Sequence, residues 1–276
     1  MTTSIHRTYG HEIGFAKTIR TDRWWVGPVL TFLGLSAFIV YTTWAAFQGN
    51  HYFYGSYLSP FYSPLFFIDP NVAGAAPLSH ALLGAWPAWW PSWLPASPAL
   101  FILIFPGTFR FTCYYYRKAY YRSFVGSPPA CAVGPIPRKA YKGETHFLIF
   151  QNLHRYAMYF ALIFVVILST DAVLSFFRDG QFGVGVGSFV LVLNAALLAC
   201  YTLGCHSWRH IVGGRLDCFS CTAVTRKRYG IWKRVTALNE RHMLFAWISL
   251  FWVGFSDFYV RMVSMGIWRD FSTWGN

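Results

Sequence analysis

Charged residues are scarce in this sequence, and acidic residues are scarcest. Only 12% of the 276 residues are charged, and 10 Asp and Glu face 23 Lys and Arg. A soluble domain usually has about twice that charged fraction, so the composition excludes an ordinary soluble protein. The sequence also contains no GxGxxG or P-loop motif, and we therefore expect no bound nucleotide.

In place of charge, the sequence has long apolar runs. Four of them have about 20 residues or more and at most two charged residues each, at 24–47, 157–177, 182–205 and 243–266. Such runs are long enough to cross roughly 30 Å of hydrocarbon as helices. A fifth run, 98–121, is interrupted by Pro106, Gly107 and Arg110, and we expect a helix kinked near the proline.

These runs predict an all-α membrane protein with one transmembrane domain over residues 1–276. Its five transmembrane helices are expected at about 24–47, 98–121, 147–177, 182–210 and 240–266.

The net charge of +13 is unevenly distributed. Four Lys and Arg lie in 1–23, six in 117–146 and eight in 206–241, but none in 48–97. This alternation is the positive-inside pattern. It predicts a multi-pass plasma-membrane protein with a cytoplasmic N-terminus and an external C-terminus (N-in/C-out). The charge is thus explained by topology and by docking of a soluble partner, with no need for nucleic acid.

The loop between the first two apolar runs, 48–97, is rich in Tyr, Trp, Phe and Pro. Aromatic side chains favour the membrane interface, and repeated prolines prevent a long helix. We expect a folded, lipid-contacting lid on the outer surface. The six cysteines fall in predicted helices or on the reducing cytoplasmic side, which argues against a disulfide framework. The first apolar run is also too long for a cleavable signal peptide.

Two carboxylates are predicted at membrane depth. Asp257 has a partner in Arg261 at i+4, and we interpret this pair as structural. Asp171 has no evident partner in its own helix.

Cysteine and histidine side chains gather where the apolar run 182–205 ends, in LGCHSWRHIVGGRLDCFSC. His206 and His210 are four residues apart and would share one helix face, and Cys218 and Cys221 form a CxxC pair. The prediction is a Cys₂His₂ metal site, with Cys205, His242 and His154 in reserve. Zinc, a Rieske-like [2Fe–2S] cluster and no metal remain open on the motif alone.

Haem b is a second candidate cofactor, because it needs two axial imidazoles at one depth. Nine histidines are present, but none lies in the spanning parts of the first two runs. This distribution argues against two haems, and one haem between His154 and His242 stays open.

Four segments resemble a known family: TCYYYRKAYYRSF, NLHRYAMYFALIF, LGCHSWRHIVGG and LNERHMLFAWISLFWVGFSDFYVRMVSMG. They are similar to the membrane-anchor, cytochrome-b-like subunit of actinobacterial succinate dehydrogenase, the respiratory complex II of the tricarboxylic acid cycle, which is related to fumarate reductase. The resemblance implies a flavoprotein subunit with FAD and an iron–sulfur subunit on the cytoplasmic face. A further small membrane subunit is an open question.

The resemblance also implies electron transfer from succinate, oxidised on another chain, to a quinone such as menaquinone. Five-helix members of this family usually hold two haems, and this sequence departs from that pattern. We therefore favour the Rieske-like [2Fe–2S] cluster, with haem b or zinc as alternatives. Hydrogen-bonding and apolar side chains near it predict a quinone site made of His154, Arg155, Tyr156, Trp208, Arg241 and His242.

Two other functions are compatible with the sequence. A small-molecule transporter could use Asp171, Asp257 and Arg261, although the inverted repeats and paired broken helices of many transporters are lacking. A purely structural anchor would bind neither metal nor quinone.

Overall fold

The computed structural model describes residues 14–136 and 146–274. Most of the predicted cytoplasmic N-terminus, with His6 and His11, lies outside these residues. Within them, four helices are long and apolar enough to cross a membrane. They are α1 (Val26–Gln48), α5 (His154–Leu174), α6 (Val186–Leu203) and α9 (His242–Ser264).

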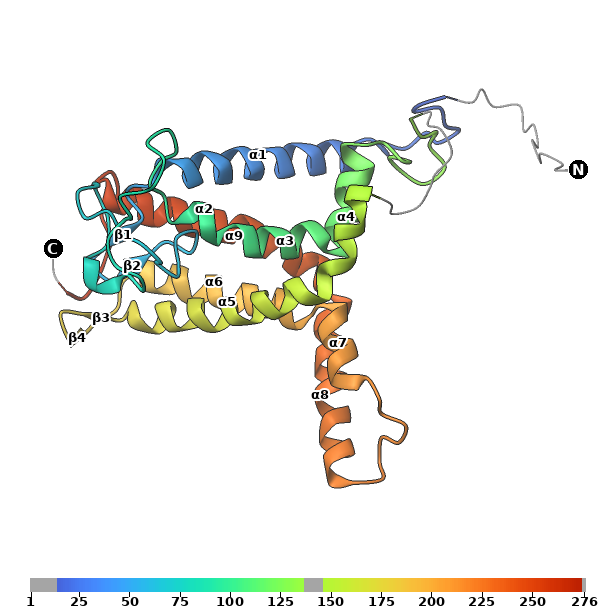
Figure 1. The fold of residues 1–276 in the computed structure, drawn as a ribbon. Coiled ribbons are helices and arrows are strands. Elements are labelled where there is room, and N and C mark those ends of the chain that lie inside the picture. Colours follow the sequence, from blue (N-terminus) through green and yellow to red (C-terminus); the bar gives the residue numbers. More distant parts are fainter. Residues whose placement is uncertain (1–13, 137–145, 275–276) are drawn as a thin grey trace, which may run out of the picture.

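These four helices form a bundle (Figure 1), and its outer faces carry exposed apolar side chains. Large side chains such as Val40, Val166 and Phe189 are 63–68% exposed. Side chains of this kind face lipid in a membrane protein and would be unfavourable in water over so large an area. The helices are thus suited to a multi-pass membrane protein.

The predicted helix over 98–121 is not formed as one helix. It is divided into α2 (Ala99–Ile102), α3 (Ile104–Thr112) and α4 (Tyr114–Ser123). The apolar part, Ala99–Thr112, is shorter than the four spanning helices. Pro106 has no N–H to offer in the first turn of α3, and the extended backbone of Cys113 (φ −65°, ψ 132°) turns α4 across the end of the bundle (Figure 1).

The predicted helix over 182–210 is also interrupted. It ends at Leu203, and α7 (His206–Gly213) starts in a new direction after Gly204 and Cys205. Gly204 is needed at this corner, because a Cβ there would lie 2.8 Å from the Cys200 carbonyl oxygen and 3.3 Å from His242 Nδ1.

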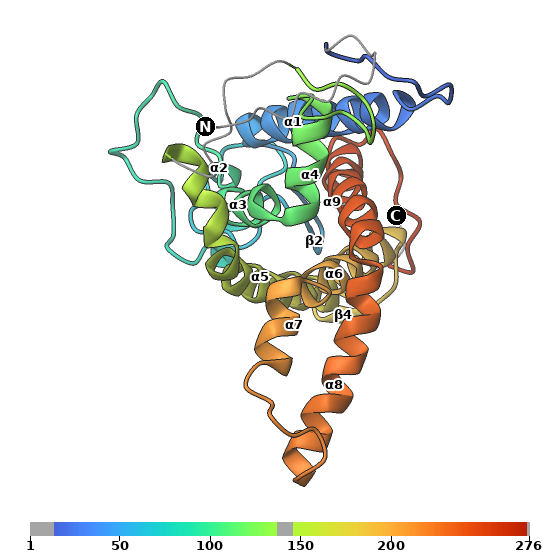
Figure 2. The same cartoon turned by 90° about the vertical axis from the view of Figure 1, so that its right-hand side faces the viewer.

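Helices α7 and α8 (Ala223–Glu240) lie side by side and project sideways from the bundle as a hairpin (Figures 1 and 2). The Arg228 guanidinium joins them by donating to the Val212 and Gly214 carbonyl oxygens, both at 2.8 Å. This hairpin and α4 lie at the same end of the bundle. The two basic segments thus share one end, as the positive-inside pattern requires, while the orientation in a membrane stays a prediction.

The aromatic loop lies at the opposite end, near the C-terminus (Figure 1). It forms a two-stranded antiparallel hairpin, β1 (Phe53–Tyr54) with β2 (Tyr57–Leu58), and one turn of 3-10 helix, η1 (Leu78–His80). Tyr52, Phe61 and Tyr62 are almost fully buried. The loop is therefore a folded lid, as predicted, and its core is continuous with residues of α1, α2 and α9.

Two shorter elements complete the fold. The turn after α5 is a second antiparallel hairpin, β3 (Phe177–Arg178) with β4 (Gln181–Phe182), and η2 (His146–Leu153) leads into α5.

Both predicted intramembrane carboxylates have partners. Asp257 is fully buried and lies 3.6 Å from Arg261 Nε, which confirms the predicted pair. Its carboxylate also accepts hydrogen bonds from the hydroxyls of Tyr41 and Ser59. Asp171 accepts a hydrogen bond from the Ser63 hydroxyl. The lid is therefore fastened to α5 and α9 by carboxylate contacts.

Candidate functional site

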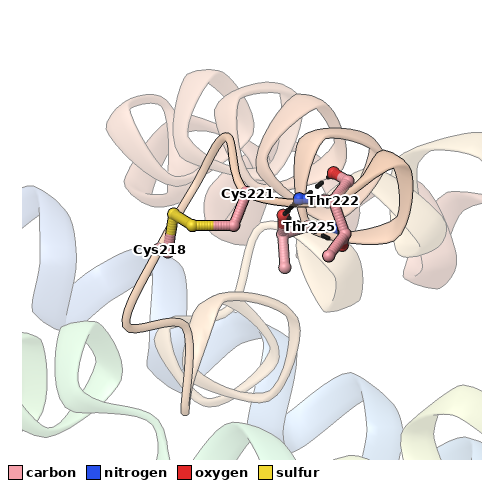
Figure 3. Close-up of a disulfide and its surroundings, with 4 residues drawn as sticks. All are labelled: Cys218, Cys221, Thr222 and Thr225. Carbon is pink, nitrogen blue, oxygen red and sulfur yellow. Dashed lines mark hydrogen bonds between the residues drawn. A yellow bond between two sulfur atoms is a disulfide. The ribbon is translucent and has the colours of Figure 1, made fainter.

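The four predicted metal ligands at 206–221 do not form one site. His206 and His210 share a face of α7, with their Nε2 atoms 2.9 Å apart. Cys218 and Cys221 lie beyond the far end of α7 and are bonded to each other as a disulfide (Figure 3). This corrects the prediction, because the four residues form two separate pairs and the thiols are not free.

The disulfide lies in the turn that leads into α8. The hydroxyl of Thr222 accepts a hydrogen bond from the Thr225 N–H, and the Thr225 hydroxyl accepts one from the Thr222 N–H, which forms a capping box (Figure 3). Capping of this kind fixes the start of a helix. The disulfide and the capping box together account for the conformation of the CxxC segment as the turn that leads into α8.

A second group of His and Cys side chains converges inside the bundle end. The thiol of Cys205 lies 3.1 Å from His154 Nε2, and the thiol of Cys113 lies 3.8 Å from His242 Nε2. All four side chains line one cavity of about 430 Å³. Three of them are the predicted reserve ligands, and Cys113 is new.

Each of the four side chains is placed by the end of a helix. His154 and His242 are the first residues of α5 and α9, Cys205 follows α6, and Cys113 separates α3 from α4. Helix ends from four parts of the chain thus place these four side chains around one cavity.

Local contacts orient the two imidazoles. Thr112 Oγ1 lies 2.9 Å from His154 Nδ1, which leaves Nε2 facing the cavity side. The ring of Phe109 stacks on His154 and the ring of Tyr201 stacks on His242, each at 4.9 Å between centroids. His154 is therefore held through its second ring nitrogen, as metal-binding histidines typically are, whereas the buried Nδ1 of His242 has no hydrogen-bond partner among the described residues.

The Cys and His side chains of the site are buried. Cys113, Cys205 and His242 are 1–2% exposed. Burial, with a smaller contribution from the nearby Cys113 thiol, raises the pKa of Cys205 to about 11. The Cys205 thiol therefore keeps its proton at neutral pH unless a cation replaces it.

No three His, Cys, Asp or Glu side chains of the described part of the chain meet closely enough to hold a single metal ion. The four residues instead form two Cys–His pairs around the cavity. We refer to Cys113, His154, Cys205 and His242 as the Cys/His group.

The predicted quinone-binding residues are only partly brought together. His154 and His242 line the 430 Å³ cavity. Arg155, Tyr156 and Arg241 are exposed, with Tyr156 64% exposed, and Trp208 packs at the edge of the core. This site stays a prediction.

The comparisons with known proteins agree with the resemblance in sequence. Residues 26–266 match the family model described as actinobacterial succinate dehydrogenase subunit SdhC. No curated protein matches the chain. A chain of the solved Mycobacterium smegmatis Sdh1 complex in the apo form is 45% identical, with a TM-score of 0.82. The similarity covers 97% of this chain and 96% of that one. The protein belongs to the actinobacterial SdhC family of succinate dehydrogenase membrane subunits.

Proposed function

We propose that this chain anchors succinate dehydrogenase in the plasma membrane and passes electrons from an iron–sulfur subunit to a quinone, menaquinone being the expected species. The family assignment supports this role. Succinate itself would be oxidised on a flavoprotein subunit with FAD. The basic end of the bundle, with α4 and the α7–α8 hairpin, is the expected docking surface for these soluble partners.

The observation that carries the electron-transfer role is the Cys/His group at that same end. Two thiolates and two imidazoles are the ligand set of a Rieske-type [2Fe–2S] cluster. In such a cluster two cysteines hold one iron and two histidines hold the other, so no three side chains need to meet at one ion. All four side chains line one cavity, which fits this requirement better than that of a single tetrahedral zinc, which needs four ligands at one ion. The contacts within the chain pair each histidine with a cysteine, so cluster binding would have to bring Cys113 and Cys205 to one iron and His154 and His242 to the other.

Haem b is less well supported by the same side chains. A haem between His154 and His242 would need a wide flat space between the two imidazoles. Here each Nε2 atom lies against a cysteine thiol. The proposed ligands are therefore Cys113, His154, Cys205 and His242, and the group would supply one-electron transfer between the partner subunit and the quinone.

The test is to measure iron, acid-labile sulfide, zinc and haem in the purified complex, with low-temperature EPR after reduction by succinate or dithionite. We expect an additional [2Fe–2S] signal with a midpoint potential between about −150 and +300 mV. The signal should be absent in the variants Cys113→Ser and Cys205→Ser. Cys200 lies in α6, shortly before Cys205. Cys200→Ser is therefore the matched control and should retain the signal.

Other results would overturn this assignment. Zinc without additional iron would indicate a structural site, and a haem spectrum lost in His154→Ala would indicate haem. Loss of the signal in Cys218→Ser but not in Cys205→Ser would restore the ligand set first predicted at 206–221. Retention of the signal in both Cys113→Ser and Cys205→Ser would exclude the Cys/His group.

A further inference from the structure

The α7–α8 hairpin lies in the plane that a membrane surface would occupy. Both helices run across the axis of the bundle rather than along it, and they lie side by side when the bundle is viewed end-on (Figures 1 and 2). The four long helices are suited to cross a membrane, so a plane across their ends is the plane of the membrane surface. One side of the hairpin therefore faces along the bundle, toward the lipid, and the other side faces away from it.

One side of α8 carries an apolar stripe. Val224, Ile231 and Val235 are seven and four residues apart, so at 3.6 residues per turn they lie within about 40° of one another around the helix. The side of α8 that packs on α7 is marked by Trp232, whose ring centroid lies 4.6 Å from the Arg209 guanidinium. Trp232 is about a quarter turn from the stripe, so the stripe is on a side of the hairpin and not between its two helices.

The bundle covers this side of α8 where the two meet. Val235 is 4% exposed, and one turn later the Asn239 side-chain amide donates to the Gly204 carbonyl oxygen at the end of α6, at 2.8 Å. Toward the tip of the hairpin the same side is bare, with Ile231 43% and Val224 69% exposed. The exposed part of the stripe thus continues, beyond the bundle, the side of α8 that is packed at its base, which is the side that faces along the bundle.

Cations flank the stripe. Lys227 and Arg234 are also seven residues apart and lie about 60° around the helix from Val224 and Ile231. Both cations are exposed, and neither forms an ion pair within the described part of the chain. An apolar stripe beside basic side chains is typical of a helix that lies in a membrane interface, where the apolar side chains enter the acyl boundary and the Lys and Arg stems extend to the phosphates.

From these observations we infer that the α7–α8 hairpin lies on the membrane surface beside the bundle, with Val224 and Ile231 at the acyl boundary and with Lys227 and Arg234 on the phosphates of anionic phospholipids. Recognition of an acidic protein by charge alone would leave the stripe in water, and an uncharged lipid surface would leave the cations without a counter-charge. This lipid contact is separate from the electron transfer proposed above and does not depend on it.

The opposite side of α8 is polar. Arg226, Lys233 and Glu240 repeat at seven-residue intervals, and they lie roughly half a turn from the stripe. This side stays open to the docking of soluble partners proposed above. It also supplies control positions on the same helix for variants of the lipid-facing side.

The first experiment measures which side of α8 meets lipid in the assembled complex. A fluorescent amino acid is incorporated at Ile231 or, as the matched control, at Lys233, and each complex is reconstituted in nanodiscs of phosphatidylcholine brominated on its acyl chains. We expect bromine to quench the probe at Ile231 at least about twofold, because the stripe lies at the acyl boundary, and to leave the probe at Lys233 unquenched.

Two results of this experiment would overturn the inference. One is an unquenched probe at Ile231, as a partner subunit covering the stripe would give, and the other is equal quenching at both positions. If the variant at Ile231 does not assemble, a probe at Val224, on the same stripe, gives the same test.

The second experiment tests the headgroup with the Ile231 probe. Phosphatidylcholine nanodiscs receive a minor share of brominated phosphatidylglycerol or the same share of brominated phosphatidylcholine. We expect the phosphatidylglycerol to quench at least about twofold more, because each Lys or Arg near an anionic surface strengthens the attraction about fivefold. The preference should disappear in Lys227→Gln/Arg234→Gln. It should remain in Arg226→Gln/Lys233→Gln, which loses the same charge. Equal quenching by the two lipids in the chain with all four cations, or equal effects of the two double variants, would overturn the inference.

Discussion

The pair of Asp257 and Arg261 allows a quantitative test of the fold. Asp257 is 0% exposed and Arg261 is 1% exposed. The carboxylate receives the Tyr41 hydroxyl at 2.6 Å, and the guanidinium donates to the Asn50 carbonyl oxygen at 2.9 Å. The pair therefore links α9 to α1 and to the start of the lid.

Replacing Asp257 with Asn removes one charge and leaves Arg261 charged and buried. Loss of one partner of a buried pair costs about 3–5 kcal/mol, because the remaining guanidinium cannot lose its proton. This corresponds to a roughly 200- to 5,000-fold larger unfolded fraction. The double variant Asp257→Asn/Arg261→Met leaves no charge, and we expect it to be more stable than Asp257→Asn alone.

The assay is thermal unfolding of the complex in lipid nanodiscs, followed by tryptophan fluorescence. Asp257→Asn should lower Tm by about 10 °C or more, with partial recovery in the double variant. Quinone reduction per folded complex should be unchanged, because the pair lies at the end of the bundle opposite to the Cys/His group. A destabilisation below about 1 kcal/mol, or a double variant less stable than Asp257→Asn, would show that the buried pair does not stabilise the fold in this way. Loss of quinone reduction in folded Asp257→Asn would instead assign the pair a role in turnover.

Two further variants test the positioning of the site and the closure of the lid. Gly204→Ala should destabilise the chain by about 1–3 kcal/mol, because the new Cβ meets the Leu238 carbonyl oxygen at 3.2 Å and His242 Nδ1 at 3.3 Å. If the Cys/His group holds the proposed cluster, this variant should also lower the metal content. Gly230→Ala, where a Cβ meets no atom within 4 Å, is the control and should change neither. Asp270→Asn should loosen the C-terminal segment and speed its limited proteolysis, because the carboxylate accepts hydrogen bonds from the hydroxyls of Tyr57 at 2.8 Å and Tyr259 at 2.7 Å, and bonds to a charged group are worth about 1.5–3 kcal/mol each. Unchanged metal content in Gly204→Ala, or unchanged cleavage in Asp270→Asn, would contradict these expectations.

The sequence predicted the four long helices well, because an apolar run of 20 residues has few alternatives in a membrane. It predicted the folded lid for a related reason, since prolines and aromatic residues without charge favour a compact interfacial loop. The helix boundaries were less accurate. Nothing in the periodicity of 98–121 or 182–210 indicates that the chain turns at Cys113 and Gly204, where close packing against other segments decides the backbone.

The candidate site shows the same limit. The spacing of His206, His210, Cys218 and Cys221 within one short segment predicts a metal site there. The structure groups residues up to 129 positions apart instead, such as Cys113 and His242. Three residues of the Cys/His group, His154, Cys205 and His242, lie at or near the end of an apolar run. Cys113 lies inside the run 98–121, and only the end of α3 at Thr112 places it beside them.

The sequence by itself thus determined that this is a polytopic membrane protein with a basic end, an aromatic end and a buried ion pair at i+4. These properties depend on composition and on local spacing along the chain, and neither of these requires knowledge of how the helices pack. The tertiary structure decided which His and Cys side chains meet around one cavity. Those contacts join helices distant in sequence, so they depend on how the helices pack and on where each helix ends.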